Sequence, residues 1–242
     1  MLWQKDIIKV HLSLIIEEMT HARHILNFLK ALHIEPKLPA GVEVLNPYQN
    51  KETFALCTLF YNKYYSDDRE RVLILGINPG RLGAGLTGIP FTDPIKLDKF
   101  CHIANDLPKK PELSADFIYK VIEAYGGLNS FYGKFHFSSV SPLGFTKDNK
   151  NLNYYDIKEL QNALYQFIVG SMHQILTANI SRSKCYCLGE GQNFKYLQAF
   201  NQQHHLFEEI VPLPHPRFIM QYKRKTMDRY VDDYLQKLSA VE

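Results

Sequence analysis

Apolar residues along this chain occur either in short continuous runs or at intervals of three and four residues. Short runs bounded by glycine or proline are typical of buried strands, and the three-and-four spacing is typical of helices. The pattern predicts strands at 71–75, 135–140, 184–188 and 208–211. It predicts helices at 13–33, 114–125, 156–178, from just after Gly191 to about 202, and 224–238.

Capping and helix-breaking residues set the expected ends of these helices. Ser114 and Asp156 are predicted N-caps, because their short polar side chains can accept bonds from free backbone N–H groups. Pro36 forbids continuation of the first helix, and Gly126-Gly127 ends the second. The first helix is expected to bury one stripe, formed by Ile15, Met19, Ala22, Leu26 and Leu29.

Strands separated by helices predict an α/β fold, a three-layer α/β/α sandwich around a central, mainly parallel four-stranded sheet. The chain has no internal repeat, low-complexity tract or long linker. We therefore expect residues 1–242 to form a single domain, with an N-terminal helical extension over about 1–50. In such sheets the ligand site lies beyond the carboxyl ends of the strands.

The composition, with 45% hydrophobic and 22% charged residues, is that of an ordinary soluble globular protein. A net charge of +3 permits nucleic-acid binding without requiring it. The start of the chain does not resemble a signal peptide, and no apolar run reaches the roughly 18 residues of a membrane span. We expect a cytoplasmic monomer that does not bind a membrane.

The four cysteines have neither CxxC nor zinc-site spacing. We expect reduced, buried thiols, with Cys185 and Cys187 in the core on one strand, and no metal site. His204-His205 lacks partners at ligand spacing and is expected at the surface.

The segment Gly76–Asp93 contains five glycines and two prolines, more than a simple connection requires. Glycines let a backbone approach a flat ligand closely, and prolines fix the shape of the loop. Asn78 offers both a donor and an acceptor, so it can hold a water or read a polar edge. Phe91 provides a ring on which a planar base can stack. The alternatives are a purely structural loop and a phosphate-binding loop, although the usual phosphate-loop signatures are absent.

Pro214 and Pro216 flank His215, and Arg217 follows directly. Two prolines fix the backbone, which favours an imidazole that faces a ligand at a set angle. Both this segment and the glycine-rich loop follow predicted strands, so both are expected at one edge of the sheet.

Gly76-Ile77-Asn78-Pro79-Gly80, followed by Gly88-Ile89-Pro90-Phe91, resembles the water-activating motif of single-strand-selective monofunctional uracil-DNA glycosylases. That motif runs Gly-Met-Asn-Pro-Gly and then Thr-Gly-Val-Pro-Phe at the same spacing. His215-Pro216 is similar to the second motif of the family. Two shorter matches lie between them in order, Ser141-Pro142-Leu143 and Asn151-Leu152.

The resemblance implies a role for each matching residue. Asn78 would position the water that attacks the anomeric carbon of deoxyribose. His215 would donate a hydrogen bond to O2 of the leaving base, and Phe91 would stack on the flipped base. Ile77 and Gly80 would line the base pocket. The implied partner is DNA, single- or double-stranded, and no cofactor is required.

The chain departs from the family pattern at the position that reads the base. The family has an asparagine there, whereas this chain has Ser139, whose hydroxyl cannot make the two-point contact of an amide. Either another group reads the base or the substrate range differs, for instance toward deaminated purines. Glycine at position 80, where relatives that exclude thymine carry tyrosine, implies room for modified uracils such as the 5-hydroxymethyl form.

Four residues are expected to contact DNA. Arg81 lies inside the first motif, and Arg217 and Phe218 replace the family's wedge, where either is long enough to fill the gap left by an extruded base. Lys223 begins a basic run that either meets phosphates or is a solvated helix start.

These observations predict a monofunctional DNA glycosylase that hydrolyses the N-glycosidic bond of uracil or of related deaminated or oxidised bases. The motifs contain no lysine nucleophile, so no lyase step is expected. The alternative is a catalytically weak or inactive DNA- or nucleotide-binding protein of the same fold. A small-molecule hydrolase lacks support, because no nucleophile elbow or paired-carboxylate signature is present.

Overall fold

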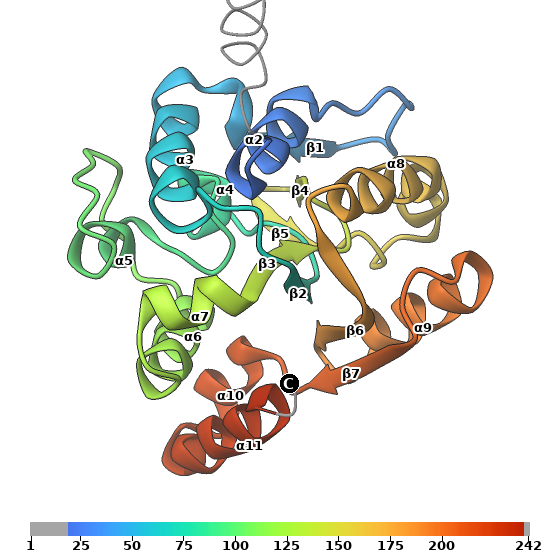
Figure 1. Ribbon diagram of the computed structural model, residues 1–242. Coiled ribbons are helices and arrows are strands. Elements are labelled where there is room, and N and C mark those ends of the chain that lie inside the picture. The colour runs from blue at the N-terminus through green and yellow to red at the C-terminus, as the bar shows by residue number, and fades with distance from the viewer. Residues whose placement is uncertain (1–18, 240–242) are drawn as a thin grey trace, which may run out of the picture.

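The computed structural model describes residues 19–239 and has a four-stranded parallel sheet at its centre (Figure 1). The strand order is β3-β2-β6-β7, and the parallel pairing of the four strands confirms the predicted α/β fold. The strands are β2 (Arg71–Gly76), β3 (Phe135–Ser139), β6 (Ile180–Leu188) and β7 (Glu209–Leu213). Every residue of β2 and β3 is buried, because helices cover both faces of this part of the sheet.

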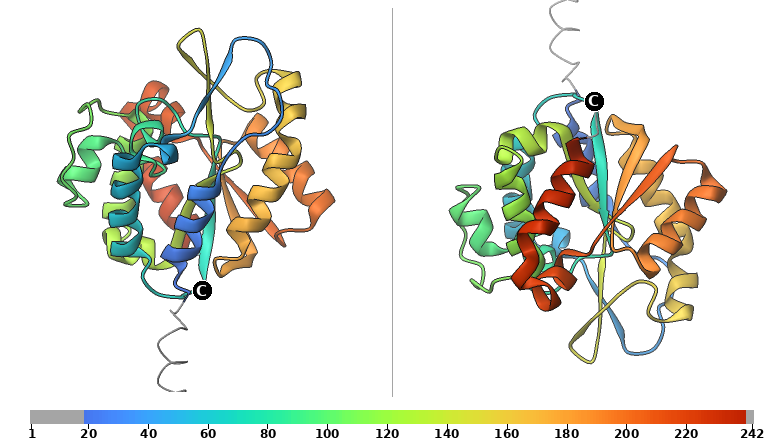
Figure 2. Two further views of the ribbon diagram at one scale, coloured as in Figure 1. Left: turned by 90° about the horizontal axis from the view of Figure 1, so that it is seen from above. Right: turned by 90° about the horizontal axis from the view of Figure 1, so that it is seen from below.

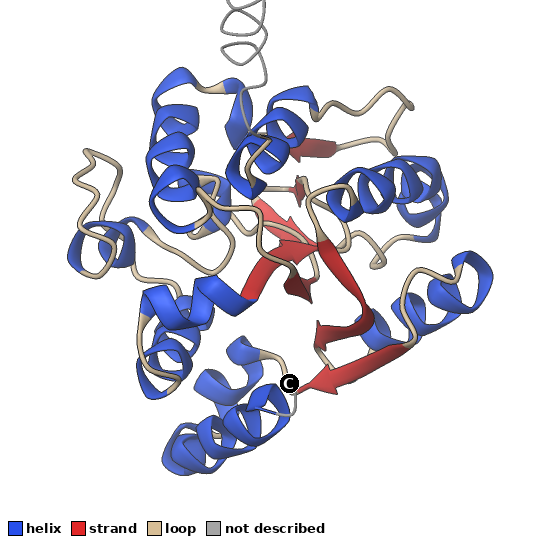
Figure 3. Cartoon of the chain, viewed as in Figure 1, coloured by secondary structure: helices blue, strands red, loops and turns tan. Residues whose placement is uncertain are grey.

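Helices form the outer layers of the sandwich (Figure 3). Figure 2 shows α3, α6, α7, α10 and α11 on one side of the sheet and α8 and α9 on the other. The helix α2 packs against both α3 and α8. Their bounds are α2 (His21–Ala31), α3 (Lys51–Tyr64), α4 (Ala84–Thr87), α5 (Pro94–Lys99), α6 (Leu113–Ala124), α7 (Leu128–Lys134), α8 (Lys158–Leu176), α9 (Gln192–His204), α10 (Pro216–Tyr222) and α11 (Met227–Ser239), with the 3-10 turns η1 (Pro47–Gln49) and η2 (Arg224–Thr226).

A second, three-stranded antiparallel sheet was not predicted from the sequence. It has the order β1-β4-β5, with β1 (Val42–Leu45), β4 (Gly144–Lys147) and β5 (Lys150–Leu152). The segment predicted as a helical extension therefore contributes a strand, β1, as well as α2 and η1. Three- and four-residue strands carry too little periodicity to be recognised without their partners.

The first helix begins later than predicted and buries a different stripe. Thr20 caps α2, with its side chain accepting a hydrogen bond from the Arg23 N–H. Met19 lies before this cap and is 47% exposed, and Leu26 is only partly buried. The buried residues are His21, Ala22, Ile25, Phe28 and Leu29. The part of the predicted helix before residue 19, including Ile15, lies outside the described residues.

Two predicted N-caps are also wrong. The cap of α6 is Glu112, whose carboxylate accepts hydrogen bonds from the N–H groups of Ser114 and Ala115. Asp156 does not cap α8; its carboxylate accepts from the Asn153 N–H at 2.8 Å, in the turn before the helix. At α6 a neighbouring acidic residue takes the free donors, whereas before α8 a backbone N–H of the preceding turn takes the carboxylate, and α8 has no side-chain cap. A single sequence cannot resolve such local competition.

Five helices of the described residues were missed, namely α3, α4, α5, α7 and α10, and the last helix, α11, begins at Met227 and not at about 224. Asn50 caps α3, whose buried positions recur at three- and four-residue intervals, so its signal was present in the sequence. Because Lys223 and η2 interrupt the C-terminal segment, α10 and α11 are separate helices. Within the described residues no helix is long and apolar enough to span a membrane.

The prediction for the cysteines is confirmed, whereas the prediction for one of the two adjacent histidines is wrong. All four cysteines are free and buried, and Cys185 and Cys187 lie in the core of β6 as predicted. His204 is not a simple surface residue: it is partly buried, and its Nε2 lies 2.8 Å from the Tyr165 hydroxyl.

Arg71, at the start of β2, is fully buried and engages every nitrogen of its guanidinium. Its Nε donates to the Tyr132 carbonyl oxygen at 2.7 Å, and its terminal nitrogens donate to both carboxylate oxygens of Asp67 at 2.8 and 3.2 Å. It also lies 4.7 Å from the centre of the Tyr65 ring. A buried arginine is tolerable only when it is paired and fully hydrogen-bonded, and here it joins α3, α7 and β2.

Two histidines are buried beside this arginine. His21 Nε2 and His136 Nδ1 are 3.3 Å apart, and both rings pack against Tyr65. Burial, and then the charge of Arg71, lowers the pKa of His21 to about 3. Burial also lowers the pKa of His136 well below its usual value, with His21 and Arg71 adding to the effect. Both rings are therefore neutral in the folded protein.

The buried histidines should make the protein sensitive to mild acid. Between pH 6.5 and pH 4 the unfolded chain takes up protons on these rings and the folded chain does not, so the free energy of unfolding falls as the pH falls. For His21, with its pKa lowered to about 3, the loss is about 3 kcal/mol at pH 4, and His136 contributes in the same direction. Urea denaturation across this range should show a shallower loss for His136→Gln than for the wild type. The exposed His173→Gln is the matched control and should keep the wild-type slope. Equal slopes for wild type and His136→Gln would contradict the assignment.

Candidate active site

A cleft of about 740 Å³ opens at the carboxyl edge of the central sheet. The cleft is lined by the loop after β2, the end of β3, β5 and the residues around it, the start of α6, and α10. The strands are parallel, and Gly76 and Ser139 are direct partners in register. Chain segments distant in sequence therefore meet at this edge.

Asn78 lies in the loop directly after β2, and backbone groups in and just after β5 hold its amide. Its Nδ2 donates to the Leu152 carbonyl oxygen at 3.2 Å, and its Oδ1 accepts from the Tyr154 N–H at 3.0 Å. The two bonds fix the orientation of the amide and identify which atom is the oxygen. A carbonyl oxygen has a second lone pair, so Oδ1 can still accept a hydrogen bond from a water in the cleft.

His215 lies between β7 and α10 and lines the same cleft. Its Nδ1 accepts a hydrogen bond from the Arg217 N–H at 3.2 Å and so caps α10. Burial, with a smaller effect from the Arg217 charge, lowers the pKa of His215 to about 4. The ring is therefore neutral near pH 7. With its lone pair on Nδ1, its proton is on Nε2, which is the atom free to donate to a ligand.

Phe91 has a backbone conformation that bulky residues seldom adopt, with φ at +54°. Its ring lies over Gly76: a Cβ built on that glycine would be 2.8 Å from Phe91 Cζ. The ring also contacts Phe137 on β3, at 5.1 Å between centroids. A glycine at the end of β2 is what allows the ring to come this close.

The residues around Phe91 hold the strained backbone. Thr87 Oγ1 donates to the Thr92 carbonyl oxygen at 2.6 Å, and the Asp93 carboxylate accepts from the Glu112 N–H at 2.9 Å. Thr92 and Asp93 are fully buried, and Lys96 forms ion pairs with Asp93 and Asp116. Strained conformations persist only where surrounding contacts determine them in this way.

Gly88 begins this turn under a second steric constraint. Its φ is +70°, and a Cβ there would lie 2.4 Å from the buried Cys57 sulfur. Any other residue would therefore have to shift α3 or the loop that carries Phe91.

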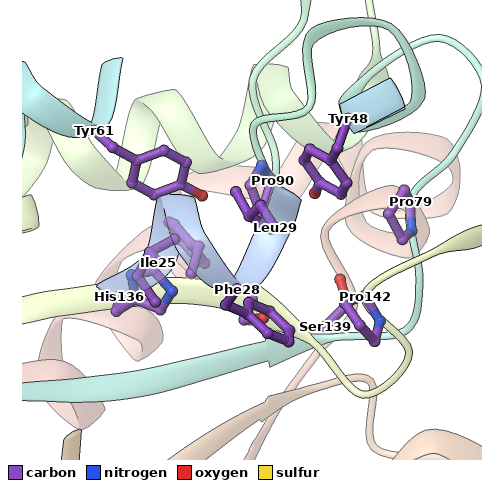
Figure 4. A pocket seen from close by; sticks show the side chains of 12 residues that line it. Ile25, Phe28, Leu29, Tyr48, Tyr61, Pro79, Pro90, His136, Ser139 and Pro142 are labelled. Atoms are coloured by element: carbon purple, nitrogen blue, oxygen red, sulfur yellow. The ribbon is translucent and has the colours of Figure 1, made fainter. Parts of the chain in front are cut away.

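Ser139 ends β3 between the cleft and a second, much smaller cavity. That cavity has a volume of about 10 Å³, near the minimum for one water. Figure 4 shows the side chains of Tyr48, Tyr61 and His136 around it, with Ser139 at the side of Pro79 and Pro142. The serine hydroxyl is thus the polar group that β3 presents to the cleft.

Asn151 on β5 is a cleft residue whose role the sequence did not predict. Its Oδ1 accepts from the Arg81 N–H at 3.1 Å, and a Cβ built on Gly80 would lie 3.3 Å from its Nδ2. The space expected beside Gly80 is therefore partly filled by an amide. The match of Asn151-Leu152 to the family pattern was its only signal in the sequence.

The rim of the cleft on the α10 side carries Arg217 and two exposed aromatic rings. Phe218 is 44% exposed and Tyr222 is 68% exposed, and their ring centroids are 5.6 Å apart. Gln221 also lines this side. Exposed aromatic residues at the mouth of a cleft favour a partner with flat apolar faces.

The cleft walls are predominantly cationic. Arg81, Lys150 and Arg217 line them, and in the described part of the chain none of the three forms an ion pair. Glu112 is the one acidic lining residue, and burial raises the pKa of its carboxyl. A cleft with unpaired cations attracts a polyanion.

The sequence pattern of the Uracil DNA glycosylase superfamily matches residues 63–239, which include all these cleft residues. The chain belongs to the uracil-DNA glycosylase superfamily. The structure of this family member is similar to the crystal structure of wild-type SMUG2 from Pedobacter heparinus, with a TM-score of 0.89 and 44% sequence identity. The similarity covers 92% of this chain and 98% of that one. No curated protein matches the chain.

In this superfamily member the cleft brings together nearly all the residues singled out from the sequence. Ile77, Asn78, Gly80, Phe91, Ser139 and His215 line it, as do Arg81, Arg217 and Phe218. Lys223 does not: it is the exposed C-cap of α10 and lies outside the cleft wall. Besides Asn151, sequence reasoning missed Lys150, Glu112 and Tyr222, which reach the cleft through elements it did not predict or place there.

The close contact between Phe91 and Gly76 predicts a site-specific effect of Gly76→Ala. The added methyl meets the far end of the ring, so the ring must move while the strand stays in place. We expect a stability loss of only about 1–2 kcal/mol, together with a loss of at least about tenfold in base release from DNA. Thermal unfolding and single-turnover kinetics measure the two effects.

Gly170→Ala is the matched control, because a Cβ there has nothing within 4 Å. It should leave activity unchanged and stability equal or slightly higher. Full activity in Gly76→Ala would show that the position of the Phe91 ring does not matter.

Proposed function

We propose that this protein is a monofunctional DNA glycosylase that hydrolyses the bond between deoxyribose and uracil or a related damaged base. The observation that carries the proposal is that a fixed asparagine amide, a neutral histidine and a constrained phenylalanine ring line one cationic cleft. Membership of the superfamily supports the reaction class.

The proposed role of Asn78 is to hold the attacking water. The two backbone bonds at its amide support this role, because they leave an oxygen lone pair at a fixed orientation. The water oxygen forms a bond to C1′ as the bond from C1′ to the base nitrogen breaks. The base departs with that electron pair, and the water gives up a proton to solvent or to the base.

The proposed role of His215 is to stabilise the negative charge that builds on the departing base. The neutral ring carries its one proton on Nε2, and this N–H can donate a hydrogen bond to a base oxygen while the proton stays on the ring. A donor aimed at a developing anion contributes about 3–4 kcal/mol. The low pKa also means that the ring keeps this protonation state throughout the neutral pH range.

The proposed roles of Phe91 and the α10 rim concern the extruded base and the gap it leaves. A base leaving the stack would lie against Phe91, and either Arg217 or Phe218 would fill the gap in the DNA. The exposure of Phe218 at the mouth of the cleft supports the second part.

Ser139 bears on which base is removed and on a second candidate function. A single hydroxyl at this position supports a substrate range wider than uracil, including 5-hydroxymethyluracil and the deaminated purines hypoxanthine and xanthine. Serine at this position, where the family has asparagine, also favours the alternative, a protein of this fold that binds DNA or nucleotides with little or no turnover.

An oligonucleotide cleavage assay decides between these two functions. Single- and double-stranded DNA with one uracil, hypoxanthine, xanthine or 5-hydroxymethyluracil is incubated with the protein and then with alkali, which breaks abasic sites. We expect cleavage at one or more of these bases after alkali and none before it, since no lyase step is proposed. Absence of abasic sites with all four bases in both strand contexts would leave only the binding function.

Loss of the two proposed catalytic groups should slow the base-release step and leave the fold intact. We expect Asn78→Ala and His215→Ala each to reduce the single-turnover rate at least about tenfold. The exposed His173→Gln, far from the cleft in sequence and absent from its lining, should keep the wild-type rate. Circular dichroism and thermal unfolding verify folding. Rates near wild type for both alanine variants would show that the roles are misassigned.

A further inference from the structure

The hairpin formed by β4 and β5 carries two lysines that face each other. A two-residue turn, Asp148-Asn149, joins the strands, with φ of +50° and +57°. Both values are left-handed, as a tight hairpin turn requires. The residues on either side of the turn, Lys147 and Lys150, are direct partners in the antiparallel register.

Charge repulsion between these two lysines destabilises the hairpin. Direct partners in an antiparallel ladder point to the same face, and like charges placed there repel each other. Both lysines are exposed, and among residues 19–239 neither forms an ion pair. Asp148 is the one acidic residue of the hairpin, so the tip keeps a net positive charge. An anion bound between two such ammonium groups would remove the repulsion.

The hairpin is held at a fixed position relative to the cleft. Lys150 lines the cleft wall, and Asn151 anchors the backbone N–H of Arg81. The next residue, Leu152, accepts the hydrogen bond from Asn78. In Figure 2 the hairpin projects from the body of the molecule. The lysine pair is therefore rigidly connected to the loop that holds the proposed catalytic asparagine.

We propose that Lys147 and Lys150 together bind a backbone phosphate of the DNA strand that enters the cleft. Arg217, on α10, lines the same cleft as Lys150, so two separate elements bring cations to it. Phosphate contacts of this kind fix the position of a protein on DNA and carry no base information. This inference rests on the proposed function for its partner, DNA, and assigns the hairpin as a second DNA-contacting element beside α10.

The test measures binding to undamaged DNA, so that base release does not enter it. Fluorescence anisotropy with a labelled duplex gives Kd at a series of KCl concentrations for the wild type and for Lys147→Ala/Lys150→Ala. The slope of log Kd against log[KCl] should decrease by about 0.9, since this is the contribution of one neutralised phosphate. Affinity at low salt should fall severalfold. Lys147→Arg/Lys150→Arg should keep both values near wild type.

Lys99→Ala/Lys120→Ala is the matched control, because both lysines are exposed, lie outside the cleft lining and leave the same net charge. If the hairpin variant and this control have the same slope and Kd, the phosphate site is wrong. The cleavage assay separates the two proposals. If the hairpin variant binds DNA more weakly but the wild type releases no base, the glycosylase function is refuted and the phosphate site is supported. If the wild type releases a base but the hairpin variant binds DNA as the wild type does, the glycosylase function is supported and the phosphate site is refuted.

Discussion

The site depends on the close packing of the Phe91 ring against the backbone of Gly76, where β2 ends. A side chain on that glycine would push the ring away, and the ring would lose its contact with Phe137. The same arrangement forces Phe91 into a left-handed backbone conformation, which costs free energy. Buried Thr92 and Asp93, with their hydrogen bonds, hold that conformation, so part of the stability of the fold is used to position one ring.

Parallel pairing brings the rest of the site to this ring. Gly76 and Ser139, the last residues of β2 and β3, are direct partners in the parallel register. His215 follows β7, which runs parallel to β6, so it lies at the same edge of the sheet. The small antiparallel sheet then contributes β5 to the lining of the cleft. Asn78 is fixed by backbone groups of Leu152 and Tyr154, in and just after β5, and by a longer bond from its Nδ2 to the Pro79 carbonyl oxygen in its own loop, at 3.4 Å. The orientation of the Asn78 amide is thus a property of two sheets together.

Charge in the cleft is distributed to suit an anionic partner and a reaction that generates an anion. The pKa of the histidine is lowered by burial and, to a smaller extent, by the Arg217 charge, and its Nδ1 caps α10, which leaves a donor on Nε2. The cations remain unpaired at the walls, and the nearby acidic groups Asp93 and Asp116 are paired with buried Lys96. Among the described residues that line the cleft, Arg81, Lys150 and Arg217 outnumber the one acidic residue, Glu112, so the net charge of the lining is positive.

The sequence by itself determined the four central strands, the parallel α/β class, the glycine-rich loop and His215 between its prolines. These features are local: an apolar run, a loop composition or a flanking proline can be read from adjacent residues. Only the tertiary structure decided the N-caps at Glu112 and Thr20, the β1-β4-β5 sheet, the separation of α10 from α11 and the approach of Asn151 to Gly80. The small sheet and the approach of Asn151 to Gly80 depend on partners far along the chain. The caps depend on which of several neighbouring polar side chains reaches the free N–H groups. That choice is made by packing energy in the folded molecule, which local sequence does not encode.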